Sequence, residues 1–588
     1  MTDLKSPGAF AMPDADALSS VWKRVVSSSV DAAFASADRA RSAPAPLAFD
    51  PTAPARAFAE FGAALMANPA ALAAAQAKAM QEWASLFSGA GFGAPAIEPQ
   101  KGDRRFSDPA WGEAPFDFLK QAYLLAARQM TDLVSQTSGL DSKTRARVDF
   151  FVRQYLYALS PANYPLTNPE AVKKAMETGG LNLLGGLANL LADIAAPDQW
   201  IARRAAGDFV LGRDLAATPG TVVFENDLMQ LIQYAPSTEK ARARPLLYVP
   251  PLVNKYYLMD LTPEASLFKW LIAEGFTVFA ISWINPGAEL QGKDFADYVL
   301  EGPVAALKAI EKAAGSEPVD IFSFCMGGAI AAAATACLNA KGEGRRIASL
   351  TLIGALMDYA DLGEWSTFVE HAQIEAFNEH IDKTGMASGD DLKKLFSVVR
   401  ANDLIWNSVV DHYLLDRKAP ASDLLYWFAD GANMTGAFLK TWSRDILHAN
   451  KLCEGGLEVG GVPIDLSAIS QPVFNVALKE DHVSGWEAVF RNGRYFGGQT
   501  RFLLGGSGHN AGVVNPPAKK KHGYWIDDRA CESPADWLAG AEKREGSWWP
   551  EWRDFLVSGV LTQKSVAARE PGNGLAVIEP APGRYVRG

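Results

Sequence analysis

One cysteine of the chain stands where a reactive nucleophile would be placed. Residues 319–338 read VDIFSFCMGGAIAAAATACL, so an apolar run meets a small-residue helical stretch at Cys325. The pattern is that of a nucleophile elbow, usually G-x-S-x-G, with Ser323 and Gly327 flanking the cysteine. A helix that begins at this point directs backbone N–H groups and the positive end of its dipole at the sulfur, which favours the thiolate. We therefore predict that Cys325 is a catalytic nucleophile, with a buried structural cysteine as the alternative.

A nucleophile at such an elbow needs a histidine base that follows it in the chain. The chain has seven histidines, and four of them lie between positions 371 and 448, in a stretch without strand-like runs. His509 instead follows the apolar run TRFLLG, within the loop sequence GGSGHNAG. A position after the last strand suits the base, so we predict His509 for that role. His482, which stands beside an acidic residue, is the second candidate.

The acid that orients the histidine is expected after the preceding apolar run. Asp481 directly follows VFNVALKE and precedes His509, so we predict that it is this acid. The resulting chain order, Cys, Asp, His, is that of the α/β-hydrolases. Asp358, which follows the run ASLTLIG, and Glu480 are the alternative acids.

Backbone N–H groups must stabilise the oxyanion that forms when a thiolate attacks a carbonyl carbon. The residue after the nucleophile, Met326, supplies one donor in elbows of this kind. The second is expected in VPPLVNKYY (249–257), where we predict Val253 and keep Leu252 as the alternative. Because thiol attack on a thioester is close to isoenergetic, this set favours acyl transfer from acyl-CoA or a related carrier. A hydrolase is the alternative.

Short apolar runs that alternate with helical stretches must position these residues. Such runs predict a mostly parallel sheet covered on both faces, so the predicted fold class is α/β, with an α/β-hydrolase-type sheet. The alternation stops between Gly354 and Gln471, and we predict a helical cap insertion over about 355–450. The runs cover residues 246–250, 276–282, 319–324, 348–354, 473–478 and 500–505.

Upstream of the sheet, the composition divides the chain further. Residues 1–100 are rich in Ala and Pro and are predicted to be a variable, partly flexible segment. Apolar residues at spacings of three and four predict two short amphipathic helices there, around Phe61 and Trp83. Residues 101–200 are predicted to form a mainly helical N-terminal domain, and residues 201–588 the catalytic domain.

The overall composition excludes several classes of protein. Of 588 residues, 48% are hydrophobic and 21% charged, which is ordinary for a globular protein. The formal net charge of −11 disfavours nucleic acid as a partner. Four sparse cysteines, no metal-ligand cluster and no phosphate-binding loop predict a reducing compartment, no bound metal and no resident cofactor. Without a signal peptide or an apolar stretch long enough to span a membrane, the protein is predicted to be cytoplasmic.

From about residue 103 to its end, the chain resembles the class I polyhydroxyalkanoate synthases. The matching segments are long and unusual in composition, so coincidence is a poor explanation for them. They include TNPEAV (167–172), YVPPLVNKYYLMDL (248–261), SWINP (282–286), SFCMGG (323–328), KEDHVSGW (479–486), GGSGHNAGVVNPP (505–517) and WWPEW (548–552).

The resemblance implies an enzyme that polymerises (R)-3-hydroxyacyl-CoA, with short acyl groups such as 3-hydroxybutyryl, and releases CoA as it extends a polyester. The CoA thioester is then a substrate and not a cofactor. The resemblance also implies that Cys325, Asp481 and His509 are the nucleophile, acid and base. It further implies a homodimer that associates with polyester granules and with granule-associated proteins. Ser323 is a departure, because the family's elbows usually carry glycine at this position.

Substrate contacts are predicted in two places. Tyr426 and Trp427 of the expected cap are candidates to line an acyl channel, and Asn254 lies in the expected oxyanion loop. Packing inside the cap is the alternative role for the two aromatic residues. Two other functions are kept as alternatives to polymerisation: an acyl-CoA thioesterase or esterase of the same fold, and a non-catalytic protein that coats granules.

Overall fold

The computed structural model describes residues 11–42, 52–88, 97–100, 103–196, 209–315, 317–399, 401, 405–418, 421–558 and 564–588. Parts of the predicted variable segment 1–100 lie outside the described residues. The chain divides into two compact units. The first comprises residues 1–206 with 393–421, and the second residues 207–392 with 422–588.

Among the described residues of the first unit, the regular elements are helices joined by loops. Apolar side chains of α2, α4 and α5 form one of its small cores, a cluster that includes Phe61, Val134 and Val148. The side chain of Asp141 caps α5 by accepting hydrogen bonds from the N–H groups of the two residues Lys143 and Thr144. Its helices are α1 (Ala15–Ser42), α2 (Ala53–Met66), α3 (Pro69–Ser88), α4 (Phe116–Gln136), α5 (Ser142–Ala158), α6 (Pro169–Thr178), α7 (Leu181–Ala195) and the π-helix η9 (Val409–Leu414).

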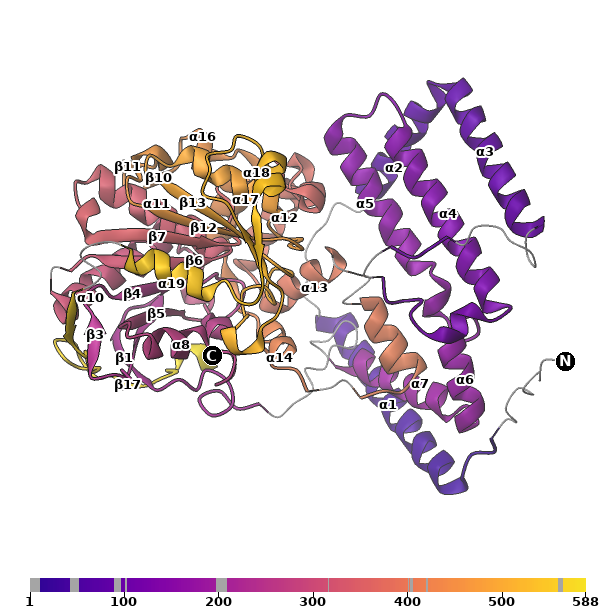
Figure 1. The fold of residues 1–588 in the computed structure, drawn as a ribbon. Coiled ribbons are helices and arrows are strands. Elements are labelled where there is room, and N and C mark those ends of the chain that lie inside the picture. Colours follow the sequence, from indigo (N-terminus) through magenta and orange to yellow (C-terminus); the bar gives the residue numbers. More distant parts are fainter. Residues whose placement is uncertain are drawn as a thin grey trace. The chain divides into compact units, whose positions relative to one another are not determined.

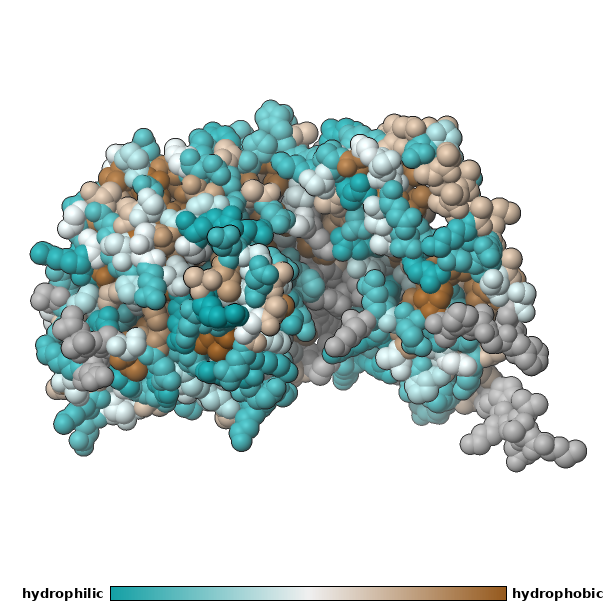
Figure 2. All heavy atoms as spheres, turned by 45° about the horizontal axis from the view of Figure 1, so that its top comes forward, coloured by the Kyte–Doolittle hydropathy of each residue, from teal (hydrophilic) through white to brown (hydrophobic). Residues whose placement is uncertain are grey.

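Helices α2 and α3 form a bent helix pair that exposes apolar side chains. They include the two amphipathic helices predicted around Phe61 and Trp83. Met66, Met80 and Phe87 are largely exposed, and brown and pale brown residues gather over this part of the unit in Figure 2. Among the described residues, no single helix has the length and hydropathy to cross a membrane. Together α2 and α3 do, but they are bent by 99°.

The predicted cap insertion, about 355–450, is divided between the units. Residues 393–421 belong to the helical unit, because side chains of α7 bind the π-helix η9 and its flanks. Asn182 donates a hydrogen bond to the Leu414 carbonyl at 2.7 Å, and Tyr413 donates one to Asp193 at 2.9 Å. The rest of the predicted cap lies in the second unit.

The second unit is built on one sheet of eleven strands, in the order β15-β14-β13-β12-β7-β6-β4-β5-β2-β1-β17. From β13 to β5 all neighbours are parallel, whereas the strands outside this block pair antiparallel. The strands are β1 (Gly220–Glu225), β2 (Met229–Tyr234), β4 (Leu246–Val249), β5 (Val278–Trp283), β6 (Val319–Phe324), β7 (Ile347–Ile353), β12 (Val473–Leu478), β13 (Thr500–Gly505), β14 (Tyr524–Ile526), β15 (Glu542–Arg544) and β17 (Glu579–Pro580).

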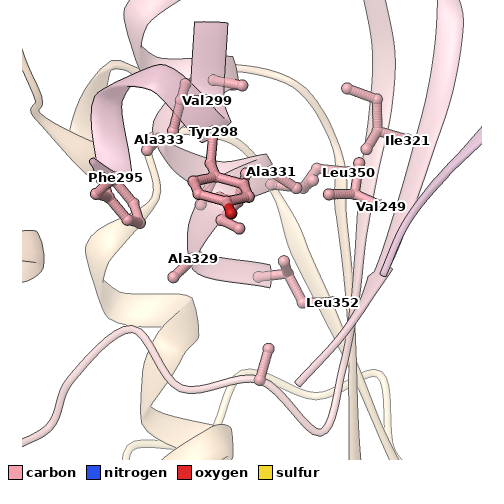
Figure 3. Packing of buried hydrophobic residues seen from close by; sticks show 14 of the residues in the cluster. Val249, Phe295, Tyr298, Val299, Ile321, Ala329, Ala331, Ala333, Leu350 and Leu352 are labelled. Carbon is pink, nitrogen blue, oxygen red and sulfur yellow. The ribbon is translucent and has the colours of Figure 1, made fainter. Parts of the chain in front are cut away.

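Helices cover both faces of this sheet (Figure 1). Along β6, Ile321 packs on one face with the alanines of α11, and Phe322 packs on the other with α8 and α19. Figure 3 shows Ile321, Leu350 and Leu352 of the sheet beside the alanines of α11. These small side chains let the helix lie close to the strands. The helices are α8 (Leu267–Ala273), α9 (Phe295–Val299), α10 (Ala305–Ala314), α11 (Met326–Ala340), α17 (Trp486–Arg491), α18 (Pro534–Gly540) and α19 (Trp549–Val557).

The segment between β7 and β12 carries most of the remaining elements. Its helices are α12 (His371–Thr384), α13 (Gly389–Val399), α14 (Asp423–Ala429), α15 (Gly436–Lys440), the π-helix η10 (Thr441–His448) and α16 (Lys451–Glu454). Its short strand pairs are β8 (Met386–Ala387) with β9 (Met434–Thr435) and β10 (Glu458–Val459) with β11 (Val462–Pro463). A further pair joins β3 (Lys240–Arg242) to β16 (Ser565–Ala567).

All six apolar runs singled out in the sequence are strands, and each prediction lies within two residues of the observed ends. They form the parallel block, and the predicted α/β-hydrolase-type fold is confirmed. In a parallel sheet, the residues that follow the strands lie at one edge. The loops after β4, β6, β7, β12 and β13 therefore meet, and these loops carry the predicted catalytic residues.

Candidate active site

Cys325 occupies a sharp turn between β6 and α11. Its backbone has φ 53° and ψ −130°, a conformation that L-residues adopt at a cost of about 1–3 kcal/mol. The turn places the residue at the N-cap position of α11, and the side chain is only partly buried. The predicted nucleophile elbow is therefore present in its geometry.

Two glycines allow the elbow to form. A Cβ on Gly327 would lie 2.4 Å from the Val249 carbonyl oxygen and 2.7 Å from that of Pro250. A Cβ on Gly328 would lie 2.3 Å from the Cβ of Ala355. The first turn of α11 thus packs directly on the backbone that follows β4 and on the loop after β7.

Ser323 is accommodated where other elbows carry glycine. It is fully buried in β6, and its hydroxyl donates a hydrogen bond to the Thr351 carbonyl of the neighbouring strand β7 at 3.1 Å. Its φ is not among the positive values of the described residues. The position therefore tolerates a serine, because the serine hydroxyl has a hydrogen-bond acceptor in the neighbouring strand.

His509 and Asp481 form a hydrogen-bonded pair at the same edge of the sheet. The distance between His509 Nδ1 and Asp481 Oδ2 is 2.6 Å. The other carboxylate oxygen accepts hydrogen bonds from the N–H groups of Val483 and Ser484 at 2.8 and 2.9 Å. The ring of Phe324 lies beside the imidazole, with the two centroids 4.7 Å apart. These contacts fix the carboxylate and orient the imidazole. Because Nδ1 faces Asp481, Nε2 is the ring nitrogen that faces away from the acid.

The surroundings of His509 give it a high affinity for a proton. Burial by itself would lower the pKa of His509, but the Asp481 carboxylate and the Cys325 sulfur outweigh burial and raise it to about 10. Both partners act by charge and by hydrogen bonding. The imidazole is thus suited to take a proton from the thiol of Cys325.

The alternative acids and the alternative base have different surroundings from Asp481 and His509. Asp358 accepts hydrogen bonds from the Tyr495 hydroxyl at 2.5 Å and from the Asn450 side chain at 2.9 Å. Burial opposes ionisation of this carboxyl, but the bond from Tyr495 and its other donors lower its pKa overall. The side chains of Glu480 and His482 are exposed. Of the candidate acids, Asp481 is the one that the structure pairs with His509.

The loop after β4 supplies the candidates for the second oxyanion donor. The close approach of Gly327 to this loop brings it beside the elbow. Among the described residues, the N–H groups of Met326, Leu252 and Val253 donate no hydrogen bond to a protein acceptor outside regular helices and strands. Leu252 is buried in the core and Val253 is half-buried. The role of Met326 and Val253 as donors to an oxyanion stays a prediction.

The predicted substrate-contact residues lie next to this loop. The Trp427 indole is 3% exposed and donates a hydrogen bond to the Lys255 carbonyl at 2.8 Å. The Asn254 side chain donates to the Trp427 carbonyl at 3.3 Å. Tyr426 is half-buried, and its ring lies 5.6 Å from that of Phe209. Trp427 and Asn254 thus contact each other, and contact with a substrate stays a prediction for all three.

One residue of the site was not predicted from the sequence. Gly354 ends the run that forms β7 and has φ +54°. A Cβ at this position would lie 3.3 Å from His509 Cε1 and 3.5 Å from Asp481 Oδ2. A glycine directly after a strand that neighbours the elbow strand was the available signal.

The described residues contain no group of three or more His, Cys, Asp or Glu side chains that could hold a metal ion.

A cavity of about 250 Å³ lies beside the acid, lined in part by Leu356, Asp481 and Val483. Its walls carry both apolar and acidic side chains, including Asp361 and Glu487.

Two family models match the chain. One, described as the N-terminus of poly-beta-hydroxybutyrate polymerase (PhaC), covers residues 102–271, and the other, the alpha/beta hydrolase fold, covers residues 260–516. A putative hydrolase from Agrobacterium vitis matches 50% of this chain and 93% of its own, with 14% identity and a TM-score of 0.31.

Relatives match over most of the chain. A poly(3-hydroxyalkanoate) polymerase of Methylorubrum extorquens is 40% identical over 498 residues, which cover 84% of this chain and 82% of that protein. The poly(3-hydroxyalkanoate) polymerase subunit PhaC of Cupriavidus necator is 38% identical over 526 residues, covering 88% of this chain and 89% of that protein.

Proposed function

Because the chain belongs to the poly(3-hydroxyalkanoate) polymerase family and is thus an acyltransferase, we propose that it joins (R)-3-hydroxyacyl groups from CoA thioesters through an acyl-Cys325 intermediate. The observation that carries this mechanism is the constellation of Cys325 at a strained elbow with the His509–Asp481 pair beside it. Polyester synthesis follows from the family. The thiol intermediate, class I membership and the preference for short acyl groups such as 3-hydroxybutyryl are our proposals.

The first half-reaction loads an acyl group onto the enzyme. His509 takes the proton of the Cys325 thiol, and the sulfur attacks the thioester carbonyl carbon. The N–H groups of Met326 and Val253 stabilise the oxyanion of the tetrahedral intermediate. Its collapse breaks the carbon–sulfur bond to CoA, and the proton held by His509 leaves with the CoA thiol.

The second half-reaction extends the polyester. The 3-hydroxyl of another hydroxyacyl unit attacks the acyl-Cys325 carbonyl, and His509 takes the hydroxyl proton. An ester bond forms, the bond to Cys325 breaks, and the proton returns to its sulfur. Asp481 orients the imidazole in both steps and stabilises its positive charge. CoA is consumed as part of the substrate, so this scheme needs no resident cofactor and no metal.

The test follows CoA release and product mass together. Purified protein is incubated with (R)-3-hydroxybutyryl-CoA, and we expect free CoA with high-mass polyester. Free CoA with only 3-hydroxybutyrate would indicate a thioesterase of the same fold and would refute polymerisation. Polyester built only from longer acyl groups would refute the short-chain preference.

A pair of cysteine variants tests the intermediate. Cys325→Ala should lose essentially all turnover, because Ser323, the other hydroxyl or thiol residue of the elbow, is fully buried and hydrogen-bonded to the Thr351 carbonyl. Cys453→Ala is the matched control, since Cys453 is also a partly buried free thiol and burial raises its pKa to about 11. Substantial polymer from the Cys325→Ala protein would refute the mechanism and would also revive a non-catalytic role for the elbow.

We also propose that the protein acts in the cytoplasm as a homodimer at the surface of polyester granules, alongside granule-associated proteins. The exposed side chains of Met66, Met80 and Phe87 on the bent helix pair α2–α3 support contact with an apolar surface. Sedimentation with polyester particles tests this, and replacing all three by serine should weaken binding. Unchanged binding would refute this role of the helix pair α2–α3.

A further inference from the structure

The loop after β4 is fastened to residues 427–432, the end of α14 and the turn that follows it. The Val253 carbonyl accepts a hydrogen bond from the Ala432 N–H at 3.1 Å. The Asn254 side chain binds the Trp427 carbonyl, and the Trp427 indole binds the Lys255 carbonyl at 2.8 Å. The predicted oxyanion residue thus lies in a stretch that is held on one side by this second segment.

One carboxylate, that of Asp430, joins two residues of this loop. The Tyr257 hydroxyl donates a hydrogen bond to Asp430 Oδ2 at 2.7 Å, and Lys255 Nζ lies 2.8 Å from Asp430 Oδ1. The Lys255 ammonium also donates to the Val586 carbonyl at 2.8 Å. The side chain of Lys255 is 9% exposed and that of Asp430 is 24% exposed, so water screens this ion pair only in part.

The contacts of Asp430 leave it no direct part in the chemistry. Both of its oxygens are engaged, one by a cation and one by a hydroxyl. Tyr257 is fully buried, and burial, together with the neighbouring carboxylate of Asp430, holds its pKa well above the usual value. Tyr257 therefore stays a hydrogen-bond donor at neutral pH. Asp430 is therefore suited to fix the positions of Lys255 and Tyr257 and not to transfer a proton.

The loop has little freedom at its other end. The Pro250 carbonyl accepts a hydrogen bond from the Trp283 indole at 3.1 Å, and the Val249 and Pro250 carbonyls lie against Gly327 of the elbow. Between these fixed points and the Asp430 contacts lie only a few residues, and Val253 is one of them. The position of its N–H therefore depends on both anchors.

We propose that Asp430 is a positioning residue for acyl transfer: through Lys255 and Tyr257 it fixes the loop whose Val253 N–H stabilises the oxyanion. This inference rests on the proposed acyl-Cys325 mechanism. Removal of one oxyanion donor costs about 10²–10³ in kcat in enzymes of this chemistry. Loosening a donor without removing it should cost less, and we expect a loss of about 10–100-fold.

The experiment compares two reactions of the same sulfur. Acyl transfer from (R)-3-hydroxybutyryl-CoA develops an oxyanion, whereas alkylation of Cys325 by iodoacetamide displaces iodide at a saturated carbon and develops none. Both rates are measured on the full chain, with alkylation followed on the peptide that contains Cys325. Asp430→Asn should slow acyl transfer about 10–100-fold and leave the alkylation rate of Cys325 within about two-fold. If Asp430 had only a structural role, Asp430→Asn would lower the rates of acyl transfer and of alkylation by the same factor.

Further variants locate the effect. Lys255→Met should behave like Asp430→Asn, and the double variant should be no slower than the slower single variant, because both remove one contact. Asp423→Asn is the matched control, since this carboxylate lies at the start of α14 and binds only the Leu424 N–H in the described hydrogen bonds. It should leave both rates unchanged.

Three results would overturn the inference: an Asp430→Asn enzyme that transfers acyl groups at the normal rate, equal losses in both reactions, or additive effects of Asp430→Asn and Lys255→Met. Failure of the proposed function looks different. In that case the unaltered protein releases CoA without forming an acyl-Cys325 peptide, whatever residue stands at 430.

Discussion

A methyl group added at Gly354 should disturb the His509–Asp481 pair. The substituted residue would keep φ +54°, and its Cβ would lie 3.3 Å from His509 Cε1 and 3.4 Å from His509 Nδ1. Comfortable separations of carbon atoms are about 3.5–4.0 Å. The imidazole must therefore shift by a few tenths of an ångström, against a hydrogen bond to Asp481 that is only 2.6 Å long.

Gly354→Ala should have two effects, a loss of stability and a loss of catalytic rate. A non-glycine residue in the left-handed region costs about 1–2 kcal/mol, of which the reduced entropy of the unfolded chain returns about 0.4–1 kcal/mol. The free energy of unfolding should thus fall by about 1 kcal/mol. A misplacement of 1 Å can cost about 10²-fold in rate, so a smaller shift of the base should lower kcat about 10-fold, with little change in KM.

The chain offers a matched control for this change. Gly363 has the same φ of +54°, but no heavy atom lies within 4 Å of the Cβ position. Gly363→Ala should therefore lose about as much stability as Gly354→Ala and keep its kcat. CoA release gives the rates and urea unfolding gives the stabilities. Equal kcat values for the two variants would refute the claim that Gly354 makes room for the imidazole.

Three further predictions concern the elbow and the acid–base pair. Asp481→Asn should lower kcat by roughly 10³–10⁴-fold without unfolding the protein, because the imidazole loses its orienting charge, and a loss below 10-fold would contradict this. Ser323→Gly should lower the free energy of unfolding by about 1–2 kcal/mol, because the hydrogen bond to Thr351 is lost and the unfolded backbone gains freedom. It should change kcat by less than about three-fold. A large loss of kcat would instead indicate a catalytic role for the Ser323 hydroxyl. Because the folded-state pKa of His509 is raised to about 10, its protonation stabilises the fold fully below the unfolded pKa of about 6.5, and this contribution is lost as the pH rises through 10. The difference in unfolding free energy between the unaltered protein and His509→Gln should therefore shrink from pH 6.5 upward, and a pH-independent difference would refute the raised pKa.

Most of the catalytic unit could be predicted because its signals are local. Each strand of the parallel block is a mostly apolar run, since both of its faces are largely buried, and its ends lie within two residues of the ends of the run. Asp481 and His509 could be predicted because each stands in the loop that follows such a run, within four residues of its end, so the fold brings both to one edge of the sheet. The outer strands β14, β15 and β17 were not predicted, because they are only two or three residues long. The outer strands β1 and β2 were not predicted either, because they form an antiparallel pair that precedes the alternation of runs and helices.

Features that depend on contacts between distant segments could not be predicted in this way. Nothing near residues 393–421 indicates that they pack with α7, which lies some 200 residues earlier. The engagement of Asp430 by Lys255 and Tyr257 likewise joins two segments that no periodicity relates. Trp427 was predicted as an aromatic lining residue, but composition does not reveal that its indole N–H binds a loop carbonyl.

The strand order of the sheet has a consequence for biosynthesis. Cys325 follows β6, which lies between β4 and β7, and these three strands leave the ribosome before the long segment that precedes β12. The acid and the base follow β12 and β13, at the end of the parallel block. Long-range strand pairing of this kind is slow compared with local folding. A nascent chain therefore carries the Cys325 thiol without the His509 imidazole until the last two parallel strands have been made and have docked.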